Sequence, residues 1–549
     1  AAPAAAPKAA PAPVPAAKDL AMPTPADPVP FWELAPARAA ELKPTRGRTD
    51  DNPLHVVHFT AEMAPLAKVG GLGDVVQGLA RACGERGHNV EVLMPYYECI
   101  PDEEVEGLEH VMDFDCPKGR MWDGEFDLTT LKTSAWKGKI GGCDVIMLRP
   151  NWDDTNIFRG GRIYGGSYNE LEAYLYFCRA GLEFLRQSGR QPHVIHVHEW
   201  QCSAAAMIYW EAYNKEMPNA KVVLTVHNMD NTGECRQEEF DVTGLPGEAF
   251  NTLERAMDER TIGHNPERMS LLKGGIVYSN VVTTVSPTYA EETINHGAAG
   301  WLNATLAEYL KKYHGVLNGI DTVLWDPEND PFIAAPYNAS NPGGKRVCKQ
   351  YVQSGLGLEV NPDKPLVVCI TRLVPQKGVH LILHAIRTTV ANGGQFVLLG
   401  SGHSDGEFKE LAAGEFKDSP DCRLMITYSD QLSHHLYSAA DIVLVPSMFE
   451  PCGLTQMTAM RYGAVPLVRR TGGLADTVHD VDSPGDGKKP NGFTFDGVDE
   501  GSLDGALLRA LKYYKDPNRQ FWEDLSTYGM SVDNSWNRSA ESYLKLYYE

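Results

Sequence analysis

After Pro53, hydrophobic and polar positions follow two alternating patterns. A short apolar run over residues 54–59 precedes apolar positions at helical spacing over 72–83, and a second apolar run covers 89–94. This pattern predicts a strand, a helix and a second strand that pairs in parallel with the first. Further runs of the same kind occur at 193–198, 221–226, 281–285, 365–370, 395–399, 423–427 and 441–445. Helical stretches lie between them, so we expect parallel sheets covered by helices on both faces.

A chain of 549 residues is too long for one ordinary hydrophobic core. A segment rich in Pro, Asn and Asp over 323–343 separates two sets of strand-like runs, which predicts two doubly wound α/β domains with a ligand cleft between them. Residues 1–50 are rich in Ala and Pro and show no periodicity, so we expect a disordered tail there.

Composition and charge narrow the function. The formal net charge of −22 disfavours nucleic acid and anionic membranes as partners, and the apolar runs are too short to span a bilayer. The 11 cysteines include no C-x-x-C pair, which argues against a disulfide framework or a zinc ribbon and favours a reducing compartment.

A glycine-rich loop lies between the first predicted strand and helix. Gly70 and Gly71 would let backbone N–H groups approach an anion at a helix N-terminus, and Lys68 adds a positive charge. The spacing matches neither the dinucleotide fingerprint nor a Walker A loop. A purely structural turn is the alternative.

Two further loops follow strands of the second domain. Arg372 and Lys377 would neutralise a diphosphate, or they are ordinary solvated cations. Glu450 precedes Pro451 at a predicted helix start, where it faces the expected cleft or simply interacts with the helix dipole. A fourth loop places two glycines after Arg470 and is either another anion-facing helix start or a turn.

Several residues could suggest a metal. His196 and His198 share one strand face and, with Glu199, could suggest a metal, but a third ligand at suitable spacing is not visible, so we disfavour a metal site. The acidic triplets that begin at Asp113 and Asp480 are expected to have surface or loop roles. His227, which ends a predicted strand, is expected to face the cleft.

Taken in order, these motifs resemble the glycogen and starch synthases, which are retaining GT-B glycosyltransferases. The resemblance runs from about residue 54 to the C-terminus. It rests on Glu62-Met-Ala-Pro-Leu-Ala-Lys68 with the glycines that follow, Asn318-Gly-Ile-Asp321, Arg372 with Lys377, the Glu450 to Gln456 segment, and Arg470 to Val478. Val69, where many relatives have Thr, looks like soluble starch synthase classes III and IV.

The resemblance implies roles for individual residues. The catalytic positions are Glu450, His227, Arg372 and Lys377. The positions that bind the nucleotide sugar are Lys68, Gly70, Gly71, Asp74, Asn228, Asn318, Tyr428, Cys452, Gly453, Leu454 and Thr455, where Tyr428 matches the position that stacks on adenine. The acceptor positions are Glu62, Glu199 and Trp200.

Two positions depart from the family pattern. Most relatives have Asp at the position of Glu199. The acceptor-side role of Glu199 therefore requires a cleft that accommodates one extra methylene group. Ala173 stands where relatives have Arg, which puts a local salt bridge and acceptor contacts in doubt.

The resemblance also implies an architecture and an activity. It divides the chain into a tail (1–50), an acceptor-side domain (51–317), a nucleotide-sugar domain (318–530) and a C-terminal helix (531–549) that returns to the first domain. The implied reaction moves glucose from ADP-glucose to the non-reducing end of an α-1,4-glucan with retention, without a metal or other cofactor, in the plastid stroma. A glucan phosphorylase with pyridoxal phosphate and a silent glucan-binding scaffold remain the alternatives.

Overall fold

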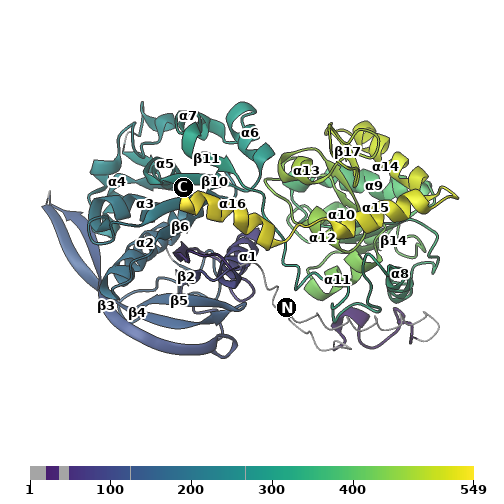
Figure 1. The fold of residues 1–549 in the computed structure, drawn as a ribbon, viewed down its shortest axis with the longest axis horizontal. Coiled ribbons are helices and arrows are strands. Elements are labelled where there is room, and N and C mark those ends of the chain that lie inside the picture. Colours follow the sequence, from purple (N-terminus) through teal and green to yellow (C-terminus); the bar gives the residue numbers. More distant parts are fainter. Residues whose placement is uncertain (1–19, 36–48, 124, 168, 266) are drawn as a thin grey trace, which may run out of the picture. The chain divides into compact units, whose positions relative to one another are not determined.

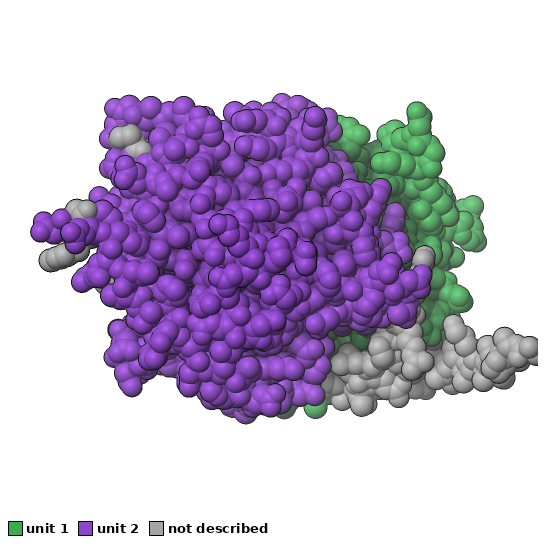
Figure 2. Space-filling model, turned by 60° about the vertical axis from the view of Figure 1, so that its left-hand side comes forward, with its two compact units in different colours: residues 1–43, 323–449, 455–533 green, residues 44–322, 450–454, 534–549 purple. Residues whose placement is uncertain are grey.

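The computed structural model describes residues 20–35 and 49–549, except residues 124, 168 and 266. The chain forms two compact units (Figure 2). Unit 1 comprises residues 1–43, 323–449 and 455–533, and unit 2 comprises residues 44–322, 450–454 and 534–549. The chain therefore passes from one unit to the other several times, and the first passage into unit 1 after the N-terminal region falls at 322/323 rather than at the predicted 317/318.

Unit 2 is built on a nine-stranded sheet (Figure 1). In spatial order its strands are β11 (Tyr313–Gly315), β10 (Val281–Thr284), β7 (Lys221–Val226), β6 (Val194–His198), β1 (His55–Phe59), β2 (Asn89–Pro95), β5 (Cys143–Pro150), β4 (Glu125–Ile140) and β3 (Glu106–Trp122). The pairs from β11 to β5 are parallel, and β4 pairs antiparallel with both β5 and β3. A two-stranded sheet of β8 (Glu234–Arg236) and β9 (Arg268–Ser270) accompanies it.

Most helices of unit 2 lie between these strands in the sequence, and α16 follows the last of them. The helices are α1 (Gly71–Glu85), α2 (Glu170–Gln187), α3 (Glu199–Ile208), α4 (Gln237–Phe240), α5 (Leu271–Tyr278), α6 (Pro287–Asn295), α7 (Asn303–Glu308) and α16 (Trp536–Tyr548). Helix α16 comes from the C-terminal end of the chain and lies against α1. A Cβ atom on Gly78 of α1 would lie 2.0 Å from the indole Nε1 of Trp536, so the contact requires glycine there.

Unit 1 contains a six-stranded sheet whose paired strands are all parallel. In spatial order its strands are β14 (Cys422–Met425), β13 (Gln395–Leu399), β12 (Leu366–Ile370), β15 (Ile442–Val445), β16 (Val465–Arg469) and β17 (Phe493–Phe495). Its helices are α8 (Gly344–Gly355), α9 (Val379–Ala391), α10 (Gly406–Ala413), α11 (Asp430–Ala439), α12 (Thr455–Arg461), α13 (Gly472–Thr477), α14 (Glu500–Tyr514) and α15 (Gln520–Ser531). Two buried clusters form the core of this unit.

Both sheets share one strand order. In each, the first strand along the chain lies centrally, the next two parallel strands extend to one side, and the later strands extend to the other. This is the order of doubly wound dinucleotide-binding folds, and it confirms the predicted α/β class with two Rossmann-like domains. The strands expected from apolar runs all form, with ends that differ by a few residues.

Residues 20–35 correct the prediction of a tail over 1–50. A short 3₁₀ helix covers Phe31–Glu33, and the Phe31 side chain is buried in a core cluster of unit 1. Its ring meets those of Tyr351 and His435 edge-on, with centroids 5.5 and 4.9 Å away. The remaining parts of the predicted tail, 1–19 and 36–48, lie outside the described residues. Among the described helices, none is both long and apolar enough to cross a membrane.

Candidate active site

In unit 2, the predicted site residues follow strands at the point where the strand order reverses. Strands β1 and β6 are neighbours there, and parallel sheets bind ligands at the carboxyl ends of such strands. Glu62 and Lys68 follow β1, Glu199 follows β6, and His227 follows β7. The topology thus brings together groups that lie far apart in the sequence.

Glu62 shapes the glycine-rich loop. Its Oε2 accepts hydrogen bonds from the backbone N–H groups of Val69 (2.8 Å) and Gly70 (2.9 Å), and its Oε1 accepts one from the Tyr164 hydroxyl (2.8 Å). The Gly70 N–H is therefore already used within the protein, which corrects the expectation that it faces an anion. Gly71 begins α1, so its N–H belongs to the open first turn of that helix.

Lys68 and Asp74 form an ion pair with Nζ and Oδ1 2.9 Å apart, and both side chains are about one-third exposed (35% and 32%). Asp74 lies in the first turn of α1, where a carboxylate is favoured by the helix dipole. The two predicted nucleotide-sugar residues are adjacent, and Asp74 holds the lysine next to the start of the helix.

Glu199 connects the ends of β6 and β7. It has a left-handed backbone (φ 63°), which costs energy for a residue with a side chain. Its Oε1 accepts the N–H groups of His227 (2.5 Å) and Asn228 (2.9 Å). Burial raises the pKa of Glu199 to about 7, although these hydrogen bonds oppose the shift. Glu199 thus positions the loop of two predicted sugar-binding residues, while the neighbouring Trp200 is half-buried with its ring edge-on to Tyr174.

The segment 450–454 belongs to unit 2 although its flanking residues belong to unit 1. The Ser286 hydroxyl, just after β10, donates to the Pro451 carbonyl oxygen at 2.6 Å. Glu450 and Cys452 are both buried, and Gly453 has φ 72°, a conformation that favours glycine. Leu454, the last residue of the segment, is half-buried. The segment is therefore a defined loop.

Asn318 follows β11 in the same unit. Its side chain is 3% exposed, and its Oδ1 is buried without a hydrogen bond from any described residue. A buried amide oxygen without a partner is uncommon in folded proteins. This acceptor is therefore suited to a ligand hydroxyl.

In unit 1, the strand order reverses between β12 and β15. Arg372 follows β12 and is exposed, and its guanidinium makes no hydrogen bond or ion pair with any described residue. The loop that also carries Lys377 is fixed by a hydrogen bond from the Met448 N–H to the Gln376 carbonyl oxygen (2.7 Å). Gly378 ends this loop with φ 71°, and a Cβ there would lie 2.2 Å from the Pro446 carbonyl oxygen. The backbone of this loop is therefore fixed by its contacts with residues 446–448.

Tyr428 and Thr455 also lie in unit 1. Tyr428 is 76% exposed, between β14 and α11, so its ring is accessible for stacking. Thr455 is the first residue of α12 and is half-buried. The tyrosine ring is therefore open to a ligand.

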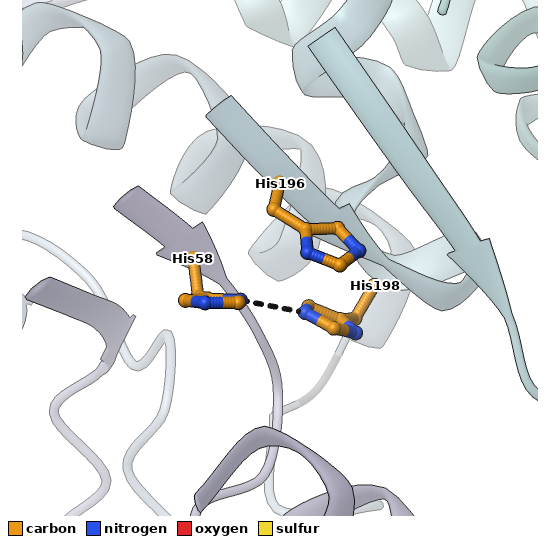
Figure 3. Close-up of side chains that lie close together, drawn as sticks. All are labelled: His58, His196 and His198. Carbon is orange, nitrogen blue, oxygen red and sulfur yellow. Dashed lines mark hydrogen bonds between the residues drawn. The ribbon is translucent and has the colours of Figure 1, made fainter. Parts of the chain in front are cut away.

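The third histidine that the sequence did not reveal is His58, on β1. His58, His196 and His198 are all buried, and their ligand atoms lie within 4.8 Å of one another (Figure 3). Both nitrogens of His196 and both of His198 already have partners: Tyr547 and Thr225 for His196, and His58 and His227 for His198. A metal would have to break these bonds, so the cluster is better described as a hydrogen-bonded network than as a metal site.

The acidic triplets are engaged in ion pairs. Arg509 pairs with Asp480 (2.9 Å) and with Asp482. On β3, Asp113 pairs with His110 (2.9 Å) and Asp115 with Lys132 (2.8 Å). Asp113 and Asp115 are exposed on β3, which agrees with the expected surface role. Asp480 is instead 5% exposed and also accepts the Thr494 N–H at 2.7 Å, so its role is that of a buried structural carboxylate.

Two doubly wound domains with polar groups at both strand-order reversals are typical of the GT-B glycosyltransferases. Two family models match the chain: "Starch synthase catalytic domain" over residues 55–308 and "Glycosyl transferases group 1" over residues 357–521. The chain belongs to the glycogen and starch synthase family.

Individual relatives agree with this placement. The chain is 42% identical to probable starch synthase 4 of Arabidopsis thaliana, over 90% of this chain and 47% of that protein, and 40% identical to glycogen synthase of Protochlamydia amoebophila, over 90% and 99%. The solved catalytic domain of starch synthase IV from Arabidopsis thaliana, bound to ADP and acarbose, matches with a TM-score of 0.82 and 42% identity over 90% of this chain and 99% of that one. The chain thus spans about half of the plant relative and nearly all of the bacterial one.

Proposed function

We propose that the chain transfers glucose from ADP-glucose to the non-reducing 4-hydroxyl of an α-1,4-glucan with retention of configuration. The observation that carries this proposal is the exposed guanidinium of Arg372, which has no partner among the described residues and lies at the strand-order reversal of unit 1. A planar cation at this place suits a diphosphate. Support also comes from the relative solved with ADP and acarbose.

The nucleotide half of the donor is assigned to cationic and aromatic groups. Arg372, Lys377 and Lys68 would neutralise the diphosphate, and the first turn of α1, which Gly71 begins, adds N–H groups and a favourable dipole. The exposed ring of Tyr428 would stack on the adenine. Negative charge on the leaving diphosphate grows during the reaction, so these groups also accelerate departure.

The glucosyl half is assigned to unit 2 and its 450–454 segment. Glu450 would stabilise positive charge on the sugar as the diphosphate departs, and His227, Asn228, Asn318 and residues 452–454 would bind its hydroxyls. We propose departure and attack on the same face, with a leaving-group oxygen taking the proton of the acceptor hydroxyl.

The acceptor glucan is assigned to the region around Trp200. The carboxylates of Glu62 and Glu199 hold loops through backbone N–H groups. We therefore propose that they shape the acceptor side and that the half-buried Trp200 ring offers a face to the glucan.

We propose that no metal is needed, because cationic side chains fill the role that a divalent ion has in other transferases. Plant relatives described as chloroplastic or amyloplastic support a plastid location, although bacterial relatives are as similar. Relatives named starch synthase 4 and starch synthase 3 agree with the class suggested by Val69.

The decisive assay compares ADP-glucose with UDP-glucose, each with a malto-oligosaccharide acceptor, with and without EDTA. We expect chain elongation with ADP-glucose that persists in EDTA. Elongation that needs glucose 1-phosphate and a pyridoxal cofactor would instead establish a phosphorylase. Glucan binding without elongation from either donor would establish a scaffold.

A further inference from the structure

The buried histidines of unit 2 form two separate hydrogen-bond systems. His196 belongs to the first: its Nδ1 lies 2.7 Å from the Tyr547 hydroxyl, and its Nε2 lies 2.6 Å from the Thr225 hydroxyl. Thr225 in turn lies 2.7 Å from the Thr283 hydroxyl, which donates to the Leu224 carbonyl oxygen. The Leu224 carbonyl can only accept, so the Thr283 hydroxyl donates to it and must accept from the Thr225 hydroxyl. The Thr225 hydroxyl in turn accepts from His196, so His196 carries its proton on Nε2.

The second system leads from the core to a predicted sugar-binding residue. His58 Nδ1 lies 3.0 Å from His198 Nε2 (Figure 3), and His198 Nδ1 lies 3.1 Å from His227 Nε2. His227 is half-buried, and its Nδ1 is neither fully buried nor bonded to any described residue. That nitrogen is therefore the exposed end of a row of three imidazole rings.

The three rings are neutral. Burial lowers the pKa of His58 and of His227 to about 3, and it lowers the pKa of His198 well below its usual value. A neutral imidazole has one N–H and one bare nitrogen. Both hydrogen bonds can then form in only two ways, with all three protons displaced toward His227 or all three displaced toward His58.

The buried end distinguishes the two arrangements. His58 Nε2 is buried and has no hydrogen-bond partner in the part of the chain that the structure describes. If the protons are displaced toward His58, this atom becomes a buried N–H without an acceptor. Folded proteins avoid a buried donor without an acceptor more strictly than a buried acceptor without a donor. If the protons are displaced toward His227, His58 Nε2 is a bare nitrogen. His58 Nδ1–H then donates to His198, His198 Nδ1–H donates to His227, and His227 Nδ1–H remains for a ligand.

We propose that His198, backed by His58, is a positioning residue that fixes His227 as the Nδ1–H tautomer. His227 then presents an N–H donor, so the sugar oxygen that meets it must act as an acceptor. The inner end of the row, His58 Nε2, is buried and has no partner among the described residues. The row therefore fixes the tautomer of His227 and does not conduct protons to solvent. This consequence for the sugar rests on the proposed function, whereas the tautomer itself does not.

The tautomer can be read directly in the free protein. In a ¹⁵N-histidine-labelled sample, the protonated and bare ring nitrogens have well-separated shifts, and the His227 signals are assigned by their loss in His227→Gln. We expect His227 protonated on Nδ1, with His198 Nδ1 and His58 Nδ1 protonated as well. His227 protonated on Nε2 overturns the proposal whatever the donor substrate is.

Two substitutions at His198 test the effect on catalysis. In His198→Leu, His227 Nε2 loses its donor, so we expect mixed tautomers and a fall in kcat of roughly tenfold, the bias that one ordinary hydrogen bond supplies. His198→Asn places an amide donor near the former Nδ1 and should restore the tautomer and most of the rate. Normal kcat in the leucine variant with a scrambled tautomer would overturn the role in catalysis.

A matched control separates positioning from simple packing. His435 in unit 1 is also buried and has a lowered pKa, of about 4, but it packs on Phe31 rather than on site residues. His435→Leu should change the melting temperature without changing the His227 shifts or kcat. If the leucine variant at 198 does not fold, the asparagine variant and the wild-type spectrum still decide the question.

Discussion

Glu450 combines a family position with a constrained setting, because it is buried at the start of a loop that Ser286 anchors. Glu450→Gln keeps the size of the side chain and removes its charge. We expect kcat to fall about 10²-fold or more, because charge that stabilises a developing cation acts mainly in the transition state. The measurement is kcat and KM for ADP-glucose together with the melting temperature, which should stay near the wild-type value.

Arg372→Ala is the comparison for that variant. It should weaken both ADP-glucose binding and turnover, because the diphosphate is charged before it departs and more charged afterwards. If Glu450→Gln kept a near-normal kcat while Arg372→Ala did not, Glu450 would lose its catalytic role and the anion site would remain.

Glu199 makes a specific contribution to the dependence of stability on pH. Its pKa is raised by burial from 4.5 to about 7, so the folded protein binds a proton that the unfolded chain releases above about pH 4.5. The contribution to stability is complete at low pH and is lost as pH rises through about 7, by roughly 3 kcal/mol in total. Glu199→Gln should remove this loss, and urea unfolding at several pH values measures it.

The variant is compared with the wild type at each pH, which cancels the titration of other carboxylates. Equal slopes of unfolding free energy against pH for the two proteins would contradict the assignment. The glutamine retains an oxygen that can accept the N–H groups of His227 and Asn228, so the loop itself should persist.

For single residues, the sequence predicted which residues belong to the candidate site but not which hydrogen bonds their side chains make. Glu62 and Glu199 were found by resemblance, but their bonds to backbone N–H groups depend on how loops turn in space. His58 could not be linked to His198, since the two are 140 positions apart and meet only through the pairing of β1 with β6. Side-chain partners of this kind require the sheet order.

At the scale of elements, the short 3₁₀ helix over Phe31–Glu33 bears on stability. Phe31→Ala should destabilise unit 1 by about 3–5 kcal/mol, because it leaves a cavity next to Tyr351 and His435. Thermal or urea unfolding measures this effect. Val29→Ala is the matched control, since Val29 is exposed and its truncation should change little. Equal stability of the two variants would show that the segment is not part of the core.

Strands could be predicted from the sequence where nearly all of their residues are buried and therefore apolar. Parallel strands are buried on both faces and read as continuous apolar runs, such as β12 and β15. The long hairpin of β3 and β4 was missed because its residues alternate between exposed and buried positions and include many charges. The 3₁₀ helix lies in a Pro-rich stretch and buries only Phe31 of its three residues, so it produces no periodic pattern of apolar positions.

At the scale of the whole molecule, unit 2 is assembled from distant parts of the chain. Helix α16 supplies Trp536, Tyr543 and Tyr547, all buried, and Tyr547 bonds to His196. Deleting residues 534–549 should therefore strongly destabilise unit 2 while unit 1 keeps its core. Calorimetry and limited proteolysis of the shortened protein provide the measurement.

Deletion of Glu549 alone is the control, because this residue is exposed and lies beyond the helix. Proteolysis that spares unit 2 in the shortened protein, with an unchanged calorimetric transition, would show that α16 is dispensable. A selective loss of unit 2 would show that the two units unfold separately.

The return of α16 also sets the order in which the protein is completed during translation. Unit 1 ends at residue 533 and so leaves the ribosome before Trp536, whereas unit 2 starts early and lacks α16 until residues 534–549 are made. The nascent unit 2 therefore carries an uncovered surface at Gly78 and His196 through the synthesis of more than two hundred further residues. Chaperones that shield apolar surfaces are expected to act on this half of the newborn chain.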